Sequence, residues 1–176
     1  MTKSTVDPQA VRDPESLPYR PCMGIMVLSP ASKIWVGRRA DAPGDAEATW
    51  WQMPQGGIDE HEDPRLAALR ELREETSVTS VEFLAESENW LTYDLPADLI
   101  PKVWGGRFRG QRQKWFAVRF TGDESEIDLG APGDPHTEFV AWRWCTIEEL
   151  PAAIVPFKRD LYLEVLRQFS PLLVDS

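Results

Sequence analysis

The sequence predicts an α/β fold made of one domain, on three observations. Short apolar runs that are typical of buried strands alternate with two segments that have the composition and spacing of helices. No internal repeat and no linker-like segment separates them. The chain has 176 residues, of which 42% are hydrophobic, and this suits one domain with its own core. Because residues 1–18 are polar and contain proline, we expect a flexible arm there, followed by a single domain over 19–176.

The first third of the chain predicts extended structure. An apolar run over 22–28 is typical of a buried strand, and a Ser-Pro break before a second run over 33–37 predicts a hairpin. A loop rich in Ala, Asp, Pro and Gly leads to an aromatic segment over 50–53. The Pro-Gln-Gly-Gly sequence over 54–57 then predicts a turn, because proline and glycine favour turn conformations.

A helix is predicted over 64–76. Asp63 supplies an N-cap oxygen, and Pro64 suits the first helical position, where a missing N–H costs nothing. The residues that follow are dense in Leu, Ala, Arg and Glu, which favour helix. At about 100° per residue, three leucines fall on one side and predict the face that packs on the core. These leucines are Leu66, Leu69 and Leu72.

The second half of the chain predicts further strands and a last helix. Apolar segments over 81–84, 114–120 and 139–144 are typical of strands, with an irregular stretch rich in Pro and Gly between the first two. The segment 159–169 is amphipathic and predicts a helix. The apolar side of that helix is formed by Leu161, Val165, Leu166 and Phe169.

The composition excludes several classes of function. With 29 acidic against 19 basic residues the net charge is −10, which repels a phosphate backbone and argues against general binding of duplex DNA or RNA. Only two histidines are present, which argues against a zinc site of the usual kind. No apolar run approaches the roughly 20 residues of a membrane span, so no membrane partner is expected. Two cysteines far apart and a polar start favour the cytoplasm. Nothing in the sequence points to a protein partner.

The first helix also carries three carboxylates on one face. Glu71, Glu74 and Glu75 lie at i, i+3 and i+4, where like charges repel by roughly 0.2–0.5 kcal/mol per pair. A bound divalent cation reverses that repulsion, and all-oxygen ligands favour Mg²⁺ or Mn²⁺. The alternative is a solvated helix face, which is the usual role of such charges. The Gly56-Gly57 pair ahead of the helix favours the metal site, since backbone and carboxylate oxygens can together surround one cation.

Residues 56–78 resemble the Nudix box, the signature of the Nudix hydrolase family. That pattern is Gly, five residues, Glu, seven residues, then Arg-Glu-apolar-any-Glu-Glu-any-Gly-apolar. The residues that match it are Gly56, Glu62, Arg70, Glu71, Leu72, Glu74, Glu75 and Val78. The one departure is Ser77, where the pattern has glycine. Glycine suits a left-handed helix end, so Ser77 is expected to cost up to about 1 kcal/mol of local strain.

Further segments, over about residues 18–170, are similar to one subgroup of that family. They include Tyr19-Arg20-Pro21, Gln113-Lys114-Trp115-Phe116 and Phe157-Lys158-Arg159. The subgroup contains bacterial RNA pyrophosphohydrolases and asymmetric diadenosine tetraphosphate hydrolases. The resemblance implies an α/β/α sandwich around a mixed β-sheet.

Two activities and one binding role follow from the resemblance. The first is Mg²⁺-dependent removal of pyrophosphate from the 5′-triphosphate end of RNA, by water attack on phosphorus. The second is cleavage of a dinucleoside polyphosphate, diadenosine tetraphosphate, to ATP and AMP. A non-catalytic module that binds nucleotides or RNA ends is a further alternative, which the complete set of box glutamates disfavours.

The resemblance also implies roles for individual box residues. Arg70 is expected to orient a carboxylate through a bidentate pair, the alternative being an ordinary surface ion pair, and Glu62 is expected to support the box. The general base is open between Glu138, on a loop outside the box, and Glu74. The expected ligands of Mg²⁺, for which Mn²⁺ is a substitute, are Glu71, Glu74, Glu75 and a backbone carbonyl near Gly56.

Substrate binding is expected from cations and from the segment before the last helix. Lys114 belongs to a local basic cluster, and strand alternation sends it to the face opposite Gln113. By resemblance, Phe157 stacks on a base; the alternative is that it caps the last helix as a hydrophobic staple. The residues expected to bind substrate are Arg20, Arg39, Lys114, Val155, Phe157 and Lys158.

Overall fold

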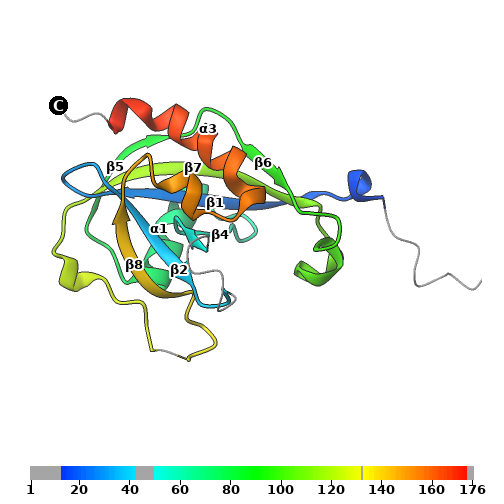
Figure 1. The fold of residues 1–176 in the computed structure, drawn as a ribbon, viewed down its shortest axis with the longest axis horizontal. Helices are drawn as coiled ribbons and strands as arrows, with labels where there is room; N and C mark the ends of the chain where they lie inside the picture. The colour runs from blue at the N-terminus through cyan, green and yellow to red at the C-terminus, as the bar shows by residue number, and fades with distance from the viewer. Residues whose placement is uncertain (1–12, 43–49, 132, 174–176) are drawn as a thin grey trace, which may run out of the picture.

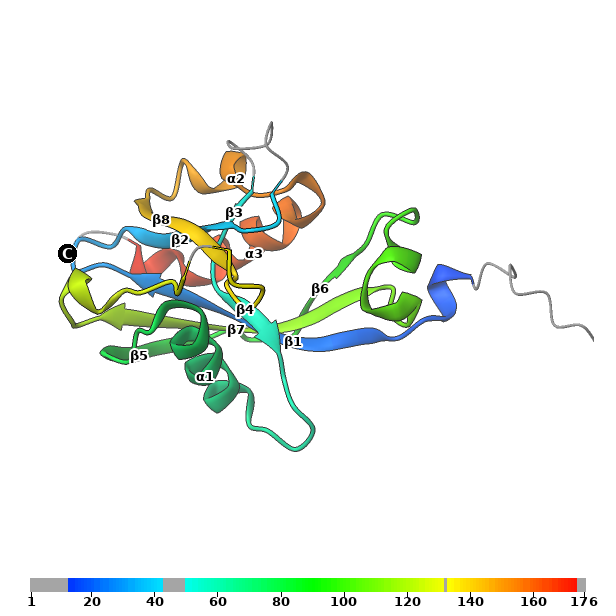
Figure 2. The same cartoon turned by 90° about the horizontal axis from the view of Figure 1, so that it is seen from below.

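A computed structural model describes residues 13–42, 50–131 and 133–173. Its strands and helices are, in chain order, β1 (Tyr19–Leu28), β2 (Ile34–Arg39), β3 (Trp51–Gln52), β4 (Gln55–Gly57), α1 (Pro64–Thr76), β5 (Val81–Glu86), β6 (Leu91–Asp94), β7 (Gly110–Phe120), β8 (Phe139–Cys145), α2 (Leu150–Ala153) and α3 (Arg159–Phe169). The strands form one mixed sheet, with α1 on one face and with α2 and α3 on the other (Figures 1 and 2). The predicted α/β/α sandwich is confirmed.

The sheet is organised around β1, which lies at its centre. β1 pairs in parallel with β7 along its whole length, from Tyr19 opposite Gly110 to Leu28 opposite Arg119, and the other pairings are antiparallel. On its other side, β1 pairs with β4 through Cys22, Met23 and Gly24 and meets β2 only at its end, where Leu28 lies opposite Ile34. β2 pairs instead with β8. One edge of β1 is therefore paired along its whole length with β7, whereas the other edge pairs with the short strand β4, which contains Gly56 and Gly57.

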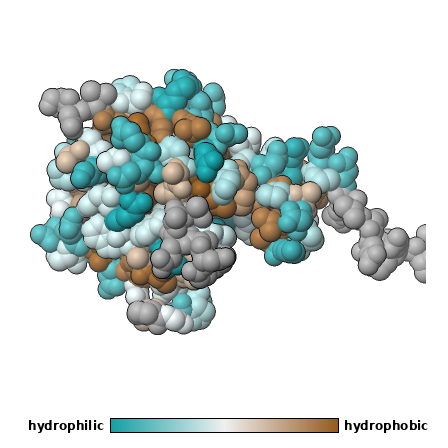
Figure 3. Space-filling model, in the orientation of Figure 1, coloured by the Kyte–Doolittle hydropathy of each residue, from teal (hydrophilic) through white to brown (hydrophobic). Residues whose placement is uncertain are grey.

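Alternation along β1 divides the hydrophobic core between the two faces of the sheet. Met23, Ile25 and Val27 pack with Leu72 of α1, whereas Met26 and Leu28 join the core cluster that contains α3. All six of these side chains are at most 2% exposed, and a core on both faces of the sheet is typical of a layered α/β domain. Hydrophobic and hydrophilic side chains alternate over the surface without one dominant apolar face in the view of Figure 3.

Both long helices have the predicted bounds. The Asp63 carboxylate accepts hydrogen bonds from the N–H groups of Arg65 and Leu66, at 2.9 and 3.2 Å, and Pro64 occupies the first turn of α1. The four predicted apolar residues of α3 are buried, and Tyr162 is buried with them. β6 and α2 were not predicted, because each is only four residues long and each lies beside or contains proline. No helix in the described ranges has the length and apolar character to cross a membrane.

The predicted packing face of α1 is wrong in two of three positions. Leu66 and Leu69 are 61% and 38% exposed, and only Leu72 is buried. The buried face is instead formed by Ala67, Ala68, Leu72, Glu75 and Thr76. Small alanines allow the helix to approach the sheet closely, and this rotation carries one glutamate inward. The same orientation of α1 that exposes Leu66 and Leu69 to solvent therefore also buries the Glu75 side chain.

The turn predicted over 54–57 is also wrong, because residues 55–57 form β4. Neither Gly56 nor Gly57 has a positive φ, so the glycines are not needed for a turn conformation. A Cβ on Gly56 would overlap the carboxyl group of Glu71, and one on Gly57 would lie 2.5 Å from Nη2 of Arg20. The glycines serve close approach of functional side chains to the backbone.

The predicted boundary between arm and domain differs from the structure. Residues 13–18 contain a short 3₁₀ turn over Pro14–Ser16, and Leu17 is buried in the core cluster on the α3 side. The packed domain therefore begins before residue 19. The rest of the predicted arm, residues 1–12, lies outside the described residues, as does most of the predicted loop over 40–48.

Ser77 ends α1 in the left-handed conformation predicted for a glycine. Its φ is +65°, its N–H donates to the Arg73 carbonyl, and its hydroxyl donates to the Asp128 carbonyl at 3.0 Å. The hydroxyl contact compensates part of the strain that a Cβ brings to this conformation, which is about 1–2 kcal/mol for a residue other than glycine.

A pair of substitutions at Ser77 separates strain from hydrogen bonding. Ser77→Ala and Ser77→Gly both lose the hydroxyl, but only glycine relieves the left-handed strain, so the glycine variant should be more stable than the alanine variant by about 1 kcal/mol. Urea unfolding of the two variants without metal measures this difference. Equal midpoints would show that φ at this position is not strained.

Candidate active site

A cavity of about 450 Å³ lies where β4, the inner face of α1 and the segment before α3 meet. We call it the cleft. Its acidic members are Glu71, Glu75 and Glu138, its basic members are Arg20, Arg39 and Lys158, and Gly56 forms part of its wall. These residues come from segments far apart in the chain, and the Nudix-box residues supply only one side of the cleft.

Glu75 is the most buried of the cleft carboxylates. It is 9% exposed, and its Oε2 atom has no hydrogen-bond partner in the described structure. Burial, followed by the charges of Glu138 and Glu71, raises the pKa of Glu75 well above its ordinary value. Burial likewise raises the pKa of Glu71, although Arg70 opposes this shift. An unpaired, buried carboxylate oxygen beside like charges is costly for the protein unless a cation or a proton compensates it.

Arg70 holds the box carboxylates together. Its Nε and Nη2 atoms donate to the two oxygens of Glu62, both at 2.8 Å, and its Nη1 atom donates to Glu71 at 3.0 Å and Glu74 at 3.1 Å. Nη2 also donates to the carbonyl of Gly57. The expected bidentate pair is therefore present, but its partner is Glu62, whose pKa the Arg70 hydrogen bonds lower to about 2. Arg70 fixes α1 relative to β4.

Glu74 is separated from the other predicted metal ligands. Its side chain is 53% exposed, it pairs with Arg70, and it does not line the cleft. Across residues 13–42, 50–131 and 133–173, no three His, Cys, Asp or Glu side chains are grouped closely enough to form a ready metal site. The assignment of Glu71, Glu74, Glu75 and Gly56 to one cation stays a prediction.

The donor chemistry of the cleft nevertheless fits a hard divalent cation. The unpartnered Oε2 of Glu75 and the Glu71 carboxylate both face the cavity, and the Glu71 carboxyl group lies directly against Gly56, where any Cβ would displace it. Carboxylate and carbonyl oxygens are the ligands that Mg²⁺ and Mn²⁺ prefer. Glu71, Glu75 and the Gly56 carbonyl are the groups that would hold such an ion.

Each cleft cation lies against an aromatic ring. The guanidinium carbon of Arg20 is 5.4 Å from the Trp104 ring centre, and that of Arg39 is 5.1 Å from the Trp50 ring centre. Lys158 is buried, with Nζ 5.5 Å from the ring centre of Tyr93. Aromatic faces attract cations without neutralising them, so these contacts leave the positive charges of Arg20 and Lys158 available to a ligand in the cleft.

Neighbouring charges affect two of these cations, Lys158 and Arg39. Burial, and then the charge of Arg39, lower the pKa of Lys158 to about 7, while Glu138 opposes the shift. Arg39 forms an ion pair with Asp41 across Nε and Nη2. A phosphate group entering the cleft would favour the charged form of Lys158 by direct attraction.

Phe157 lies between the cleft and the hydrophobic core, and its stacking on a base stays a prediction. It lines the cleft, with its ring centre 5.9 Å from that of Tyr93, and it also packs against the core cluster on the α3 side. Val155 packs against the same core cluster and does not line the cleft. Of the three residues in this segment that were expected to bind substrate, the structure therefore brings Phe157 and Lys158 to the cavity but not Val155.

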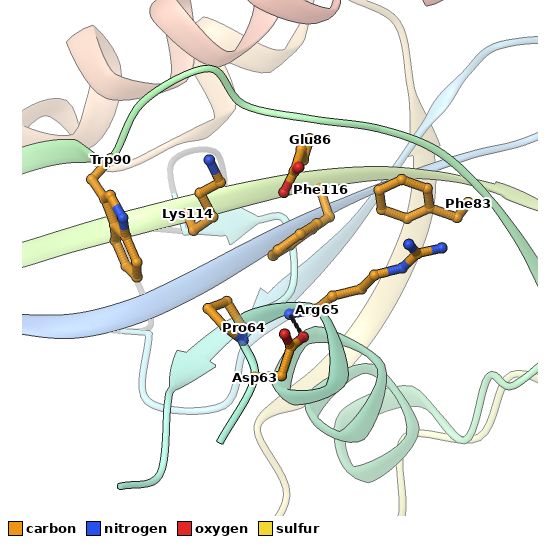
Figure 4. Close-up of a pocket in the computed structure, with 8 residues that line it drawn as sticks. All are labelled: Asp63, Pro64, Arg65, Phe83, Glu86, Trp90, Lys114 and Phe116. Atoms are coloured by element: carbon orange, nitrogen blue, oxygen red, sulfur yellow. Dashed lines mark hydrogen bonds between the residues drawn. The ribbon is translucent and has the colours of Figure 1, made fainter. Parts of the chain in front are cut away.

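Lys114 lies outside the cleft. Lys114 lies on the face of β7 opposite Gln113, as predicted, and this is the α1 side, where Lys114 lines a second cavity of about 380 Å³ together with Trp90 and Pro64 (Figure 4). Its Nζ donates a hydrogen bond to the Ser87 carbonyl at 2.7 Å. Gln111 of the same strand lines the cleft instead. The expected contact of Lys114 with substrate phosphates has no support in this geometry.

Three aromatic residues of the cleft were not predicted: Trp50, Tyr93 and Trp104. Tyr93 lies in β6, which the sequence pattern did not reveal. Trp104 precedes Gly105-Gly106 in the stretch expected to be irregular, and this glycine pair was the one signal of an unusual backbone there.

An α/β/α sandwich with buried carboxylates and aromatic-backed cations in one cleft defines a class of protein that can bind a divalent cation together with a phosphate chain. Within that class, the chain belongs to the NUDIX family, because the NUDIX domain model matches residues 18–165. Hydrolases of this family generally act with divalent cations.

Individual relatives agree with this assignment. An RNA pyrophosphohydrolase of Brucella ovis is 53% identical over 176 residues, which covers 98% of this chain and 99% of that protein. An RNA pyrophosphohydrolase of Cereibacter sphaeroides is 53% identical over 161 residues, which covers 90% of this chain and 95% of the relative. Among solved structures, the E. coli dihydroneopterin triphosphate pyrophosphohydrolase matches with a TM-score of 0.63 and 16% identity, covering 84% of this chain and 96% of that chain. That structural match bears on the fold alone.

Proposed function

We propose that this chain is an RNA pyrophosphohydrolase that removes pyrophosphate from the 5′-triphosphate end of RNA and uses Mg²⁺, for which Mn²⁺ can substitute. The observation that carries the proposal is the 53% identity to RNA pyrophosphohydrolases over nearly the whole of both chains. The chemistry of the cleft supports it, since carboxylates for a cation and cations for phosphates line one cavity. The buried free thiols of Cys22 and Cys145 accord with a reducing cytoplasm as its location.

The box residues are assigned to the metal side of the reaction. When bound, Mg²⁺ would neutralise the phosphate chain and favour water attack on phosphorus. Glu71, Glu75 and the Gly56 carbonyl hold the ion in this proposal, and Arg70 keeps Glu71 against β4. Glu74, which pairs with Arg70, has an outer role in the same set.

Glu138 is the general base in this proposal. It lines the same cavity as Glu71 and Glu75, and its charge contributes to the raised pKa of Glu75. The rival, Glu74, is half-exposed and engaged with Arg70. A base must reach the proton it removes, directly or through one water, and this requirement favours a carboxylate inside the cavity.

The remaining cleft residues are assigned to the substrate. Arg20, Arg39 and Lys158 bind phosphate oxygens, and Phe157 lies against a base. Because the whole protein carries a net charge of −10, these local cations confine binding to the end of an RNA strand and give little grip on its body.

Parallel turnover measurements test the choice of substrate. With Mg²⁺, a short 5′-triphosphate RNA should be converted to a 5′-monophosphate RNA and pyrophosphate, with kcat/KM at least equal to that for diadenosine tetraphosphate. The same RNA with a 5′-monophosphate is the matched control and should release nothing. If the RNA were slower than diadenosine tetraphosphate by about 10²-fold or more, the dinucleotide activity would replace the proposal. Binding of either substrate without any turnover would support a non-catalytic module.

A further inference from the structure

Trp104 occupies an unusual position at the edge of the cleft. It lies on the segment between β6 and β7, which extends away from the centre of the sheet (Figures 1 and 2). Its φ is +47°, in the left-handed region that disfavours any side chain with a Cβ, and two glycines with positive φ follow it. Its half-buried indole lines the cavity that contains Glu71 and Glu75. The backbone therefore accepts strain at the residue that turns an aromatic ring toward the site.

The ring that Trp104 presents faces Arg20. The guanidinium carbon of Arg20 lies 5.4 Å from the Trp104 ring centre, and the ring of Phe108 meets the indole edge-on at 6.3 Å and 76°. Phe108 lines no part of the cleft, so it fixes the indole without taking part in the cavity. The Trp104 ring is thus held between an aromatic support and a cation.

Arg20 is enclosed on two sides but not neutralised. Its Nη2 atom lies where a Cβ on Gly57 would be only 2.5 Å away, so the guanidinium packs directly against the strand that opens the box. Within the described ranges its one hydrogen bond runs from Nη1 to the weak acceptor Sγ of Cys22, at 3.4 Å. No carboxylate within the described ranges forms an ion pair with it, in contrast to Arg39 and Arg70. Most of its donors therefore remain available to a phosphate group.

We propose that Trp104 is a positioning residue for the phosphate chain of the substrate, acting through Arg20. The indole and Gly57 clamp the guanidinium between them and direct its free donors into the cleft. An aromatic clamp achieves this without the neutralisation that a carboxylate partner would bring, which matters in a cleft already lined by three glutamates. This inference rests on the proposed binding of a phosphate chain in the cleft.

The test compares Trp104→Leu with two control variants, one at the same position and one at another tryptophan. Trp104→Phe keeps an aromatic face toward Arg20. Trp90→Leu removes a tryptophan of a similar pair, with Arg112 at 4.4 Å, that lines the other cavity (Figure 4). We expect Trp104→Leu to raise KM for 5′-triphosphate RNA about tenfold with kcat changed less than about twofold. Trp104→Phe should restore KM to within about threefold of the parent value, and Trp90→Leu should leave it unchanged.

A double substitution and a second ligand complete the test. In an Arg20→Met background, Trp104→Leu should have no further effect on KM, because the residue acts through Arg20. Titration calorimetry with inorganic triphosphate should show the same tenfold loss of affinity for Trp104→Leu, whether or not the protein hydrolyses RNA.

The outcomes are distinct. If the parent protein does not convert RNA but Trp104→Leu still binds inorganic triphosphate about tenfold more weakly than the parent, the proposed function is overturned and the role of Trp104 is supported. An effect of Trp104→Leu that persists in the Arg20→Met background indicates base stacking instead and overturns the inference. If Trp104→Leu lowers both kcat and the free energy of unfolding, and Trp104→Phe restores neither, Trp104 is a structural residue and the inference is overturned as well.

Discussion

Replacing Glu75 with glutamine is expected to lower kcat by about 10³-fold or more, because removing a ligand of the catalytic cation forfeits several kcal/mol of transition-state stabilisation. The substitution preserves the shape of the side chain and removes only its charge. Steady-state turnover of 5′-triphosphate RNA with saturating Mg²⁺ measures the loss. The matched control is Glu60→Gln, whose carboxylate is almost fully exposed just before α1 and should leave turnover unchanged. Parent-like turnover by Glu75→Gln would exclude the metal assignment.

The same variant should be more stable than the parent when metal is removed. Burial and neighbouring carboxylates raise the pKa of Glu75 in the folded protein above its unfolded value of about 4.3. The stability that this carboxyl contributes is present at low pH and is lost as pH rises toward the folded pKa. Urea unfolding in EDTA should therefore show the parent losing stability relative to Glu75→Gln as the pH rises above the unfolded pKa of about 4.3. A difference in stability that does not change with pH would contradict the raised pKa.

The second large effect is expected at Glu138. Glu138→Gln should lower kcat by about 10²–10⁴-fold, the usual contribution of a general base, while KM and the Mg²⁺ concentration for half-maximal rate change little. Glu74→Gln should lower kcat by about tenfold or less, since its carboxylate pairs with Arg70 outside the cleft.

The two variants control for each other. Each removes one carboxylate charge, but only Glu138 lines the cavity that contains Glu71 and Glu75. A larger loss for Glu74→Gln than for Glu138→Gln would reverse the assignment of the base. A large rise in the Mg²⁺ requirement of Glu138→Gln would make Glu138 a metal ligand instead.

Local signals in the sequence predicted the elements that local interactions control. The N-cap of Asp63 and the proline after it determined the start of α1, and four apolar residues at helical spacing determined α3. The box spacing placed Glu71 and Glu75 one turn apart on a single helix, where the structure has them. These features depend on residues within a few positions of one another, so the sequence suffices for them.

Tertiary contacts decided the direction in which side chains point. Helical periodicity offered a leucine face and a glutamate face for α1, and the helix buries part of the latter because two alanines fit against the sheet. Alternation predicted which residues share a face of β7 but could not say that the face of Lys114 lies away from the cleft. The cleft brings together Arg20, Trp104 and Glu138 from separate segments of the chain, and no local sequence pattern predicts that these side chains lie close together.

The sequence by itself thus determined the family, the two long helices and the identity of the acidic box residues. Only the tertiary structure decided which carboxylates share a cavity, that Glu62 is the bidentate partner of Arg70, and that Trp104 faces Arg20. The physical reason is the range of the interactions. Capping, propensity and periodicity act along a few residues, whereas burial of a charge and enclosure of a cation depend on every segment that packs around it.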